Sequence, residues 1–429
     1  MYDLIVIGGG PAGYAAALEA VRRGLSTVLF EKEFIGGTCL NRGCVPTKFL
    51  AHMASIYANA GKLAKYGMFS ERVVDFQKLY QRRIEIVHSL REGLVQQMKQ
   101  KGIVIIPAEA HILDQNHIIC KEQVFETKNV LIASGSVPAD KRIQNAVSSD
   151  ELLEMQELPG KLHILGGGTA AVEFACIFRM FGSDVTVSIR ADHILTRWDR
   201  EISSGLEWSM KRKGIRIQKK CCFDDLKTDE DALILSVLGR KPNTAGLPVK
   251  LLEFGPDGGV VTDSVGRTKT GNIFAAGDVV SASPQLAHTG MEQGQRVARY
   301  LAGVPIEQPS AVVRCMYMDQ EAASVGITEA DAKICGIEVI CAKQTMYANA
   351  RTVISAGERG FIKVVAQKES GKILGAQLLC ERAGDIIAEL ALAVNNGLTV
   401  RDMLASVRPH PSYCEAVTDV LQILEEKML

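Results

Sequence analysis

The sequence lacks the features that mark several classes of protein. No apolar run reaches the roughly 18 residues that a membrane-spanning helix requires, and no signal peptide precedes the first apolar run. Neither charge is in excess, because 49 Lys and Arg residues balance 49 Asp and Glu residues. Proteins that bind polyanions usually carry a basic excess. We therefore expect neither nucleic acid nor a membrane as a partner.

The cysteines and histidines lack the patterns of a disulfide scaffold or a metal site. The 11 cysteines are odd in number and scattered, which predicts a reducing, cytoplasmic compartment. The histidines show no metal-ligand spacing, so we expect no metal. In a reducing compartment, a closely spaced cysteine pair is more often catalytic or metal-binding than structural.

Two similar segments predict nucleotide-binding folds. An apolar strand at residues 3–7 leads into a glycine-rich turn and a helix, and a second strand at 27–30 ends on Glu31. The pattern repeats from a strand at 162–165, with its glycine turn at 166–168. After these units, short alternating strands and a helix predict an α+β domain. The fold class is therefore α/β, with two Rossmann-like domains and a C-terminal α+β domain.

The first glycine turn has the composition that a dinucleotide needs. Gly8 permits a tight turn, Gly10 lets the backbone approach a pyrophosphate, and Gly13 allows close packing of helix on strand. Glu31 is placed to accept hydrogen bonds from a ribose diol. A glycine-rich turn without a ligand is the alternative, but the strand, the helix and the distal acid favour a nucleotide.

Cys39 and Cys44 are the most informative pair. On a regular helix their Cα atoms would be about 8–9 Å apart, beyond the roughly 7 Å limit for a disulfide. A bond between them requires a distorted backbone, which Gly43 permits. Cys44 near a helix N-terminus would lie in a potential that stabilises a thiolate. Two buried thiols or half of a zinc site are the alternatives, and the chain has no second pair with zinc spacing.

At these residues the chain resembles the flavoprotein disulfide reductases, and the dihydrolipoyl dehydrogenase branch in particular. The shared motifs are GGTCLNRGCVPTK at 36–48, ASG at 133–135, GRKPN at 239–243, FAAGD at 274–278 and HPSYCE at 410–415. The resemblance implies an FAD-binding domain at residues 1–145 and 245–308. It also implies an NAD(P)-binding domain at 146–244 and a dimerisation domain at 309–429.

The resemblance assigns roles to individual residues. FAD would be bound by Gly8, Gly10, Gly13, Glu31, Gly37, Thr38, Lys48, Ser134, Gly135, Asp278 and Ala287. NAD(P) would be bound by Gly166, Gly168, Arg190 and Gly239. Cys44 would face the flavin and Cys39 would exchange with the substrate, while Lys48 and Glu173 would pair beside the flavin.

His410 and Glu415 are implied as the acid–base pair. The imidazole would take a proton from the dithiol, and the carboxylate would orient it. Pro411 favours a non-helical, exposed His410 ahead of the final helix. In the family this histidine serves the partner subunit's site, which implies a homodimer with shared active sites.

The second nucleotide motif departs from the dihydrolipoyl dehydrogenase pattern. Ala171 stands at the third glycine position, and Arg190 follows the strand where an acid is usual. Arginine can hold a 2′-phosphate, so we expect NADPH to be favoured over NADH; otherwise Arg190 is a surface residue and NAD binds. Glutathione is disfavoured, since Leu18 stands where that branch has an arginine. Cys414 is either a small packed residue or a third redox thiol.

The sequence therefore predicts an FAD-dependent oxidoreductase that acts on lipoamide or a lipoyl-like dithiol. The first alternative is an NADPH-dependent reductase of another small disulfide. The second is a flavoprotein scaffold of a multienzyme complex. The presence of Cys39, Cys44 and His410 argues against a pure scaffold, which needs none of them.

Overall fold

The computed structural model describes the chain except residues 69–72, 140–144, 224–228 and 307–309. The chain divides into two compact units. Unit 1 comprises Met1–Leu50, Val74–Glu157 and Leu235–Pro309, and unit 2 comprises Ala51–Val73, Leu158–Ile234 and Ser310–Leu429. The predicted boundary between residues 308 and 309 lies outside the described residues. The division into three domains stays a prediction.

Unit 1 is built on a parallel sheet. Its strands lie in the order β3 (Val104–Ile106), β2 (Thr27–Phe30), β1 (Tyr2–Ile7), β6 (Gln123–Ile132), with β14 (Ile273–Ala275) also on β6. The first half of β6 forms an antiparallel hairpin with β5 (His117–Cys120), which pairs with β4 (His111–Ile112). The middle of β1 is fully buried, as expected for a strand in a parallel sheet.

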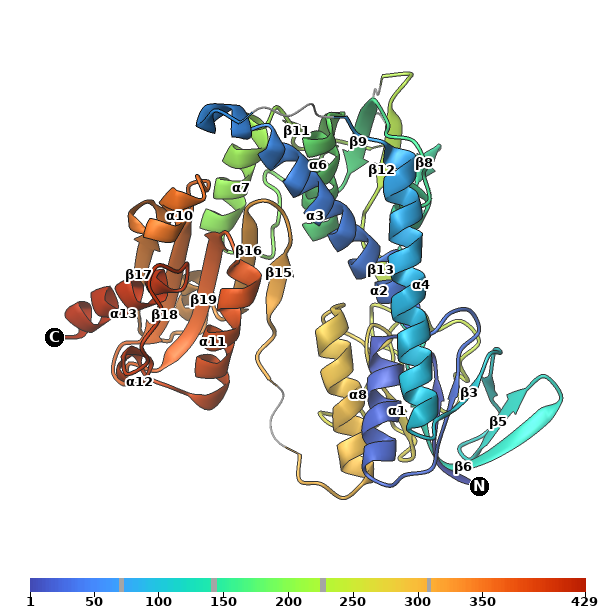
Figure 1. The fold of residues 1–429 in the computed structure, drawn as a ribbon. Coiled ribbons are helices and arrows are strands. Elements are labelled where there is room, and N and C mark those ends of the chain that lie inside the picture. The colour runs from blue at the N-terminus through green and yellow to red at the C-terminus, as the bar shows by residue number, and fades with distance from the viewer. Residues whose placement is uncertain (69–72, 140–144, 224–228, 307–309) are drawn as a thin grey trace. The chain divides into compact units, whose positions relative to one another are not determined.

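Helices α1 (Pro11–Arg22) and α8 (Ala287–Leu301) lie side by side on this sheet (Figure 1). The end of α4 (Phe76–Gln100) packs into the same apolar cluster. A Cβ atom on Gly294 of α8 would lie 2.1 Å from the Ala12 carbonyl oxygen. The close packing of α1 on α8 therefore requires glycine at this position.

The remaining elements of unit 1 are short. They are α2 (Gly37–Arg42), the start of α3 (Cys44–Ala60), β7 (Ser136–Pro138), β8 (Ala146–Val147), α5 (Ser149–Leu153) and β13 (Arg240–Pro242). Strand β13 pairs antiparallel with β7. This pairing brings the GRKPN motif beside the segment that follows β6.

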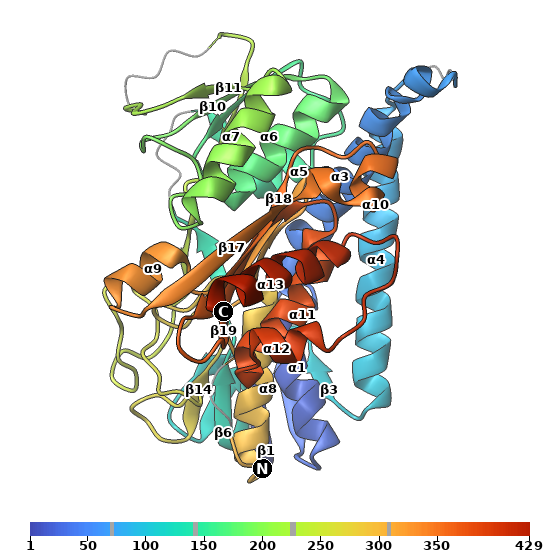
Figure 2. The ribbon, with the colours of Figure 1, turned by 90° about the vertical axis from the view of Figure 1, so that its left-hand side faces the viewer.

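Unit 2 contains the second nucleotide-binding fold. Its βαβ elements are β9 (Lys161–Leu165), α6 (Thr169–Phe181), β10 (Asp184–Ser188), α7 (Arg200–Arg212) and β11 (Arg216–Gln218). The sheet order is β11-β10-β9-β12, where β12 is Leu233–Ser236, and β9 to β11 are parallel. Figure 2 shows α6 and α7 next to each other along this sheet. The short helix Leu63–Tyr66 also belongs to unit 2.

The C-terminal part of unit 2 is an antiparallel sheet covered by helices. Its order is β15 (Arg314–Met316), β16 (Glu321–Gly326), β19 (Ile373–Cys380), β18 (Phe361–Gln367), β17 (Val339–Thr345). Helices α11 (Ala383–Asn396), α12 (Val400–Leu404) and α13 (Glu415–Met428) pack on it (Figure 2). Two short helices, α9 (Glu329–Ile334) and α10 (Ala350–Ile354), and the turn Met346–Ala348 complete it.

The predicted α/β organisation agrees with this structure, because two βαβ folds precede an α+β sheet. Among the described residues, no helix has both the length and the apolar content that crossing a membrane would require.

Candidate active site

The first glycine turn connects β1 to α1 and has no room for larger side chains at Gly8 and Gly13. A Cβ on Gly8 would lie 2.3 Å from the Ala133 carbonyl oxygen, and a Cβ on Gly13 would lie 1.8 Å from the Gly8 carbonyl oxygen. Gly10 is the N-cap of α1 and supplies no capping side chain. The first amide groups of α1 are therefore available to an anion such as a pyrophosphate.

Glu31 lies beside this turn at the end of β2. Its Oε2 accepts a hydrogen bond of 2.7 Å from the Gly9 amide. Burial raises the pKa of the carboxyl group, and the Gly9 hydrogen bond opposes that effect. A carboxylate in this place can accept hydrogen bonds from a ribose, as the sequence predicts.

Cys39 and Cys44 lie on different helices. Helix α2 contains Cys39 and ends before Gly43, and α3 begins at Cys44. A Cβ on Gly43 would lie 2.9 Å from the Thr38 carbonyl oxygen, so glycine is needed where the chain breaks from one helix to the next. This break supplies the distortion that a Cys39–Cys44 bond requires, and it places Cys44 at a helix N-terminus.

The two thiols are in contact. A hydrogen bond with the Cys44 side chain, together with burial, raises the pKa of Cys39. Burial, followed by the charges of the Cys39 and Cys44 thiols, raises the pKa of the Tyr14 hydroxyl group. Tyr14 of α1 is therefore a neighbour of the pair. The raised pKa of Cys39, together with the position of Cys44 at a helix N-terminus, makes Cys44 the better candidate for the thiolate at rest.

Helix α2 is also joined to the glycine turn. The Gly36 amide donates to the Gly9 carbonyl oxygen at 2.8 Å, and a Cβ on Gly37 would lie 2.7 Å from the Gly10 Cα atom. Both Gly36 and Gly37 have positive φ angles, of 98° and 56°. The backbone of the cysteine motif thus lies directly against the predicted pyrophosphate site, with Thr38 following in the first turn of α2 and Lys48 one turn into α3.

Two later motifs, ASG at 133–135 and GRKPN at 239–243, meet just beyond the end of β6. The Ser134 hydroxyl donates to the Asn243 carbonyl oxygen at 2.8 Å, and the Asn243 amide donates to the Gly135 carbonyl oxygen at 2.9 Å. The Gly239 carbonyl oxygen accepts from the Ala139 amide. These contacts are structural, since they join the ASG and GRKPN segments to each other. Gly239 therefore lies in unit 1, with the residues predicted to bind FAD.

Asp278 and α8 complete the set in unit 1. Ser136 donates a hydrogen bond of 2.6 Å to Asp278. Helix α8 begins at Ala287, its N-cap Leu286 offers no capping side chain, and its first turn contains no acid. Two helix N-termini without capping side chains, a glycine turn and Glu31 at a strand end fit FAD. They suit its pyrophosphate, its ribose and the negative charge that its flavin ring would gain on reduction.

The second glycine turn has the same local design. Gly166 donates from its amide to the Ser188 carbonyl oxygen at 3.0 Å, and Gly168 is an N-cap of α6 without a capping side chain. Ala171 is fully buried in α6. Arg190 follows β10 and is exposed, and its guanidinium carbon lies 4.8 Å from the centre of the Phe223 ring.

Glu173 on α6 is almost fully buried, with 4% of its surface exposed. Its Oε1 accepts a hydrogen bond of 2.9 Å from the Tyr317 amide. This contact joins the second nucleotide fold to the C-terminal part of unit 2. Lys48 belongs to unit 1 and Glu173 to unit 2, so their pairing stays a prediction.

The structure brings His410 and Glu415 together. The His410 Nδ1 atom lies 2.6 Å from Glu415 Oε1, and Glu415 Oε2 accepts 2.7 Å from the Ser412 amide. The Ser412 amide, followed by His410, lowers the pKa of Glu415 below its ordinary value of 4.5. The His410 side chain is 75% exposed and precedes α13, so its Nε2 edge is open to a reactant.

Several contacts hold the loop that carries His410. The buried Arg408 guanidinium forms hydrogen bonds with Glu389, the closest at 2.9 Å, and donates to Thr418. The Asn349 side chain donates to the Ser412 carbonyl oxygen at 2.8 Å. Cys414 lies 3.0 Å from the Ser412 hydroxyl and packs against the C-terminal core, a contact that suits a small packed residue.

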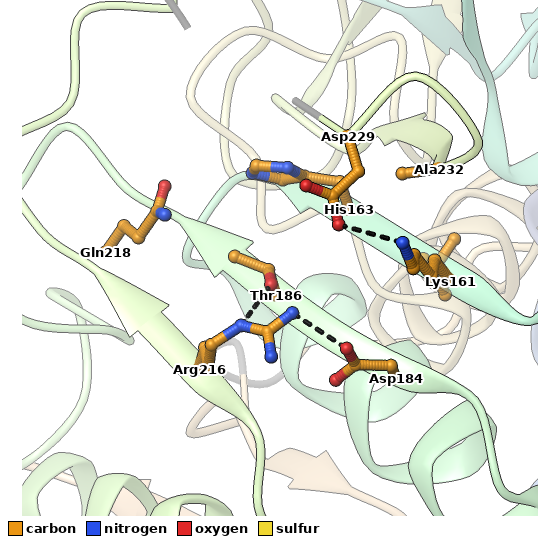
Figure 3. A pocket seen from close by; sticks show the side chains of 9 residues that line it. Lys161, His163, Asp184, Thr186, Arg216, Gln218, Asp229 and Ala232 are labelled. Carbon is orange, nitrogen blue, oxygen red and sulfur yellow. Dashed lines mark hydrogen bonds and ion pairs between the residues drawn. The ribbon is translucent and has the colours of Figure 1, made fainter. Parts of the chain in front are cut away.

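The structure also contains a polar cavity of about 350 Å³ over the second sheet (Figure 3). Its lining is Lys161, Leu162, His163, Asp184, Thr186, Arg216, Gln218, Asp229 and Ala232. It lies over β11 and over the first three residues of β9 and β10, whereas the Gly166 turn follows the carboxyl end of β9. Arg216 pairs with Asp184 at 2.9 Å and Lys161 with Asp229 at 3.3 Å. With its charges balanced, this cavity does not have the character of a phosphate site.

Sequence reasoning did not find three contacts at these sites. They are Ser136 on Asp278, Tyr317 on Glu173, and Phe223 under Arg190. The first two join residues more than 140 positions apart in the chain, and no periodicity or motif spacing reports on such pairs.

Among the described residues, no group of three His, Cys, Asp or Glu side chains is arranged to hold a metal ion.

Two family models match the chain. The model described as pyridine nucleotide-disulphide oxidoreductase matches residues 2–294, and the model of that family's dimerisation domain matches residues 312–421. Among curated proteins, the dihydrolipoyl dehydrogenase of Bacillus subtilis (strain 168) is 31% identical over 452 residues, which cover 98% of this chain and 96% of that enzyme. The dihydrolipoyl dehydrogenase of Haloferax volcanii is 31% identical over 453 residues, with 98% and 95% covered.

Solved structures show the same architecture. LpdA from Mycobacterium tuberculosis superposes with a TM-score of 0.91 at 23% identity, covering 98% of this chain and 99% of that one. The HOCl-induced flavoprotein disulfide reductase RclA from Escherichia coli gives a TM-score of 0.88 at 26% identity, covering 99% and 100%. The likeness to LpdA concerns the fold alone.

Proposed function

This chain belongs to the pyridine nucleotide-disulphide oxidoreductase family, and on that basis we propose that Cys39 and Cys44 are its redox-active pair. It is an FAD-dependent enzyme that resembles dihydrolipoyl dehydrogenases. FAD, when bound, supplies the exchange of two electrons between a pyridine nucleotide and the thiol pair. One observation supports the assignment most directly. The thiols of Cys39 on α2 and Cys44 at the start of α3 are in contact, beside the first glycine turn.

Each thiol has a distinct role in this proposal. Cys39 attacks the substrate disulfide, forming a mixed disulfide and releasing one substrate thiol. Cys44 then attacks Cys39, which releases the second substrate thiol and leaves the Cys39–Cys44 disulfide. In the direction of dithiol oxidation the same steps run in reverse. The α3 N-terminus stabilises the Cys44 thiolate until it attacks Cys39.

His410 manages the proton of these steps. Glu415 accepts a hydrogen bond from His410 Nδ1, so the Nε2 atom is left with a lone pair that takes the proton of a substrate thiol. The carboxylate also stabilises the imidazolium that results. The exposure of His410, together with the match to a dimerisation domain, supports a homodimer in which each His410 serves the partner's thiol pair.

We propose lipoamide or a lipoyl-like dithiol as the substrate, and NADPH as the favoured nucleotide. The resemblance to dihydrolipoyl dehydrogenases supports the substrate. The exposed guanidinium of Arg190 after β10 supports NADPH, because it offers a 2′-phosphate paired N–H donors. Arg190 equally favours a second candidate, an NADPH-dependent reductase of another small disulfide. The cysteine content supports a cytoplasmic location.

Steady-state assays that cross NADH and NADPH with lipoamide and several other disulfides test these proposals. Cys39→Ser and Cys44→Ser should each abolish disulfide turnover while leaving FAD bound. Cys414→Ser is the matched control and should retain turnover. Retained turnover in Cys39→Ser or Cys44→Ser would contradict the assignment of the pair.

A mixed dimer tests the shared site. Pure His410→Ala and pure Cys44→Ser dimers should both be inactive. A heterodimer of the two variants can bring one intact His410 to one intact thiol pair, so about half of the sites in each heterodimer should recover. Absence of activity after demonstrated subunit exchange would contradict a site shared between subunits.

A further inference from the structure

Phe223 lies in the segment between β11 and β12 and is not part of the proposed chemistry. Only 7% of its surface is exposed, although the residues before it in this segment, Cys221 and Cys222, are partly or fully exposed. The guanidinium carbon of Arg190 lies 4.8 Å from the centre of its ring. Arginine is attracted to an aromatic face at this distance, because its cation faces the negative side of the ring quadrupole.

Backbone hydrogen bonds fix the position of this segment beside Arg190. The Ile189 amide donates to the Gln218 carbonyl oxygen at 2.9 Å, and the Cys221 amide donates to the Ile189 carbonyl oxygen at 2.9 Å. The Lys220 amide donates to the Ala191 carbonyl oxygen at 3.1 Å, and Lys220 has a positive φ of 56°. The segment thus follows the end of β10 and turns at Lys220 before it reaches Phe223.

The charges near Arg190 favour an anion. The nearest acid in sequence, Asp192, is hydrogen-bonded to the His193 ring, which compensates its charge when the imidazole is protonated. Exposed Lys220 follows the same turn of chain. Lys220 therefore adds a second cation to the segment whose backbone pairs with Ala191, next to Arg190.

We propose that Phe223 is a positioning residue that selects NADPH by holding Arg190 ready for the 2′-phosphate. This inference rests on the proposed preference for NADPH. Stacking occupies the face of the guanidinium and leaves the N–H groups along its edge free for a bidentate contact with phosphate oxygens. An arginine that is already ordered also loses less conformational entropy when the nucleotide binds. NADH has no 2′-phosphate, so its binding gains nothing from the stack.

Two substitutions separate the ring from its volume. Phe223→Leu keeps an apolar side chain that fills the buried position but removes the aromatic face, and Phe223→Tyr keeps the face. Phe223→Leu should raise the KM for NADPH by about 2- to 30-fold, the range for cation–π contacts, with kcat unchanged. The KM for NADH should change less than twofold. Phe223→Tyr should keep the native KM for NADPH. Melting temperature and flavin content confirm that both variants are folded.

The Arg190→Gln background shows whether Phe223 acts through Arg190. With Arg190 replaced, Phe223→Leu should have no further effect on the KM for NADPH, since the two residues form one unit. A native KM for NADPH in Phe223→Leu overturns the inference. An equal rise in the KM for both nucleotides overturns it, and so does an undiminished effect in Arg190→Gln.

The same measurements distinguish failure of the inference from failure of the proposed function. A native enzyme that favours NADH overturns the proposed NADPH preference and the role of Phe223 together. A native enzyme that favours NADPH, and loses that preference in Arg190→Gln but not in Phe223→Leu, overturns only the role of Phe223.

Discussion

Replacing Glu415 with glutamine should disable His410, although the two side chains have nearly the same shape. Both neighbours of the Glu415 carboxylate are donors, because Ser412 offers its amide at 2.7 Å and His410 offers Nδ1–H at 2.6 Å. A carboxylate accepts from both, whereas a glutamine amide has one accepting oxygen and one donating nitrogen. The backbone amide of Ser412 cannot change its role. The glutamine oxygen therefore faces Ser412, and its NH₂ group faces Nδ1.

This arrangement forces the imidazole into the wrong tautomer. Nδ1 must accept the hydrogen bond, so the proton moves to Nε2, and Nε2 no longer has the lone pair that takes a thiol proton. A positioned acid–base group contributes about 10²–10⁴ in rate, which corresponds to about 2.7–5.4 kcal/mol of activation free energy. Glu415→Gln should lose that factor, and Glu415→Ala should lose no more, because alanine leaves the tautomer free.

Stopped-flow measurement of each half-reaction is the appropriate assay. The dithiol half-reaction should slow by about 10²–10⁴, while reduction by the nicotinamide cofactor should stay near the native rate. Glu426→Gln, an exposed substitution on the same helix, is the matched control. A Glu415→Gln rate within threefold of native would refute the tautomer argument.

The same pair gives a direction for the pH dependence. The Ser412 amide and His410 lower the pKa of Glu415 below 4.5, so the carboxylate is mostly ionised at pH 5 and above. Its contribution is lost only as the pH falls through the lowered pKa. Any loss of dithiol activity between pH 8 and 5 should therefore persist in Glu415→Ala, because the carboxylate does not titrate there.

Three further predictions concern stability, cofactor binding and nucleotide choice. Lys363 is 7% exposed and contacts three carboxylates. Lys363→Met should therefore lower the free energy of unfolding by about 3–5 kcal/mol in denaturant titrations. The control Lys343→Met, at an exposed lysine, should lower it by no more than about 1 kcal/mol. Gly13→Ala would place a Cβ 1.8 Å from a carbonyl oxygen, so the purified variant should contain little FAD. The control Gly160→Ala places its Cβ in open space and should keep full flavin absorbance. Arg190→Glu should lower kcat/KM for NADPH relative to NADH by roughly 10- to 150-fold, and the native preference should shrink as salt rises; native enzyme with no salt dependence would speak against a phosphate contact.

Local sequence patterns were sufficient to predict the architecture of both nucleotide folds. The apolar strand at residues 3–7, the glycine turn and the acid at Glu31 predicted a βαβ unit, and the structure has β1, α1 and β2 there. Local sequence suffices because strand, turn and helix each depend on residues a few positions apart. The Cys39–Cys44 spacing likewise indicated that a bond between the two requires a distorted backbone, and the chain breaks at Gly43 between α2 and α3.

The side chains that support these sites from distant parts of the chain became visible in the folded structure. Glu173 is oriented by the Tyr317 amide, Asp278 by the Ser136 hydroxyl, and Arg190 by the ring of Phe223. Each contact depends on how sheets and connecting segments pack against each other, and packing leaves no periodic pattern in the sequence. Arg190 shows the difference most clearly. Its charge and its place after a strand were readable from the sequence, but its direction is set by a buried ring that reaches it only after the chain turns at Lys220.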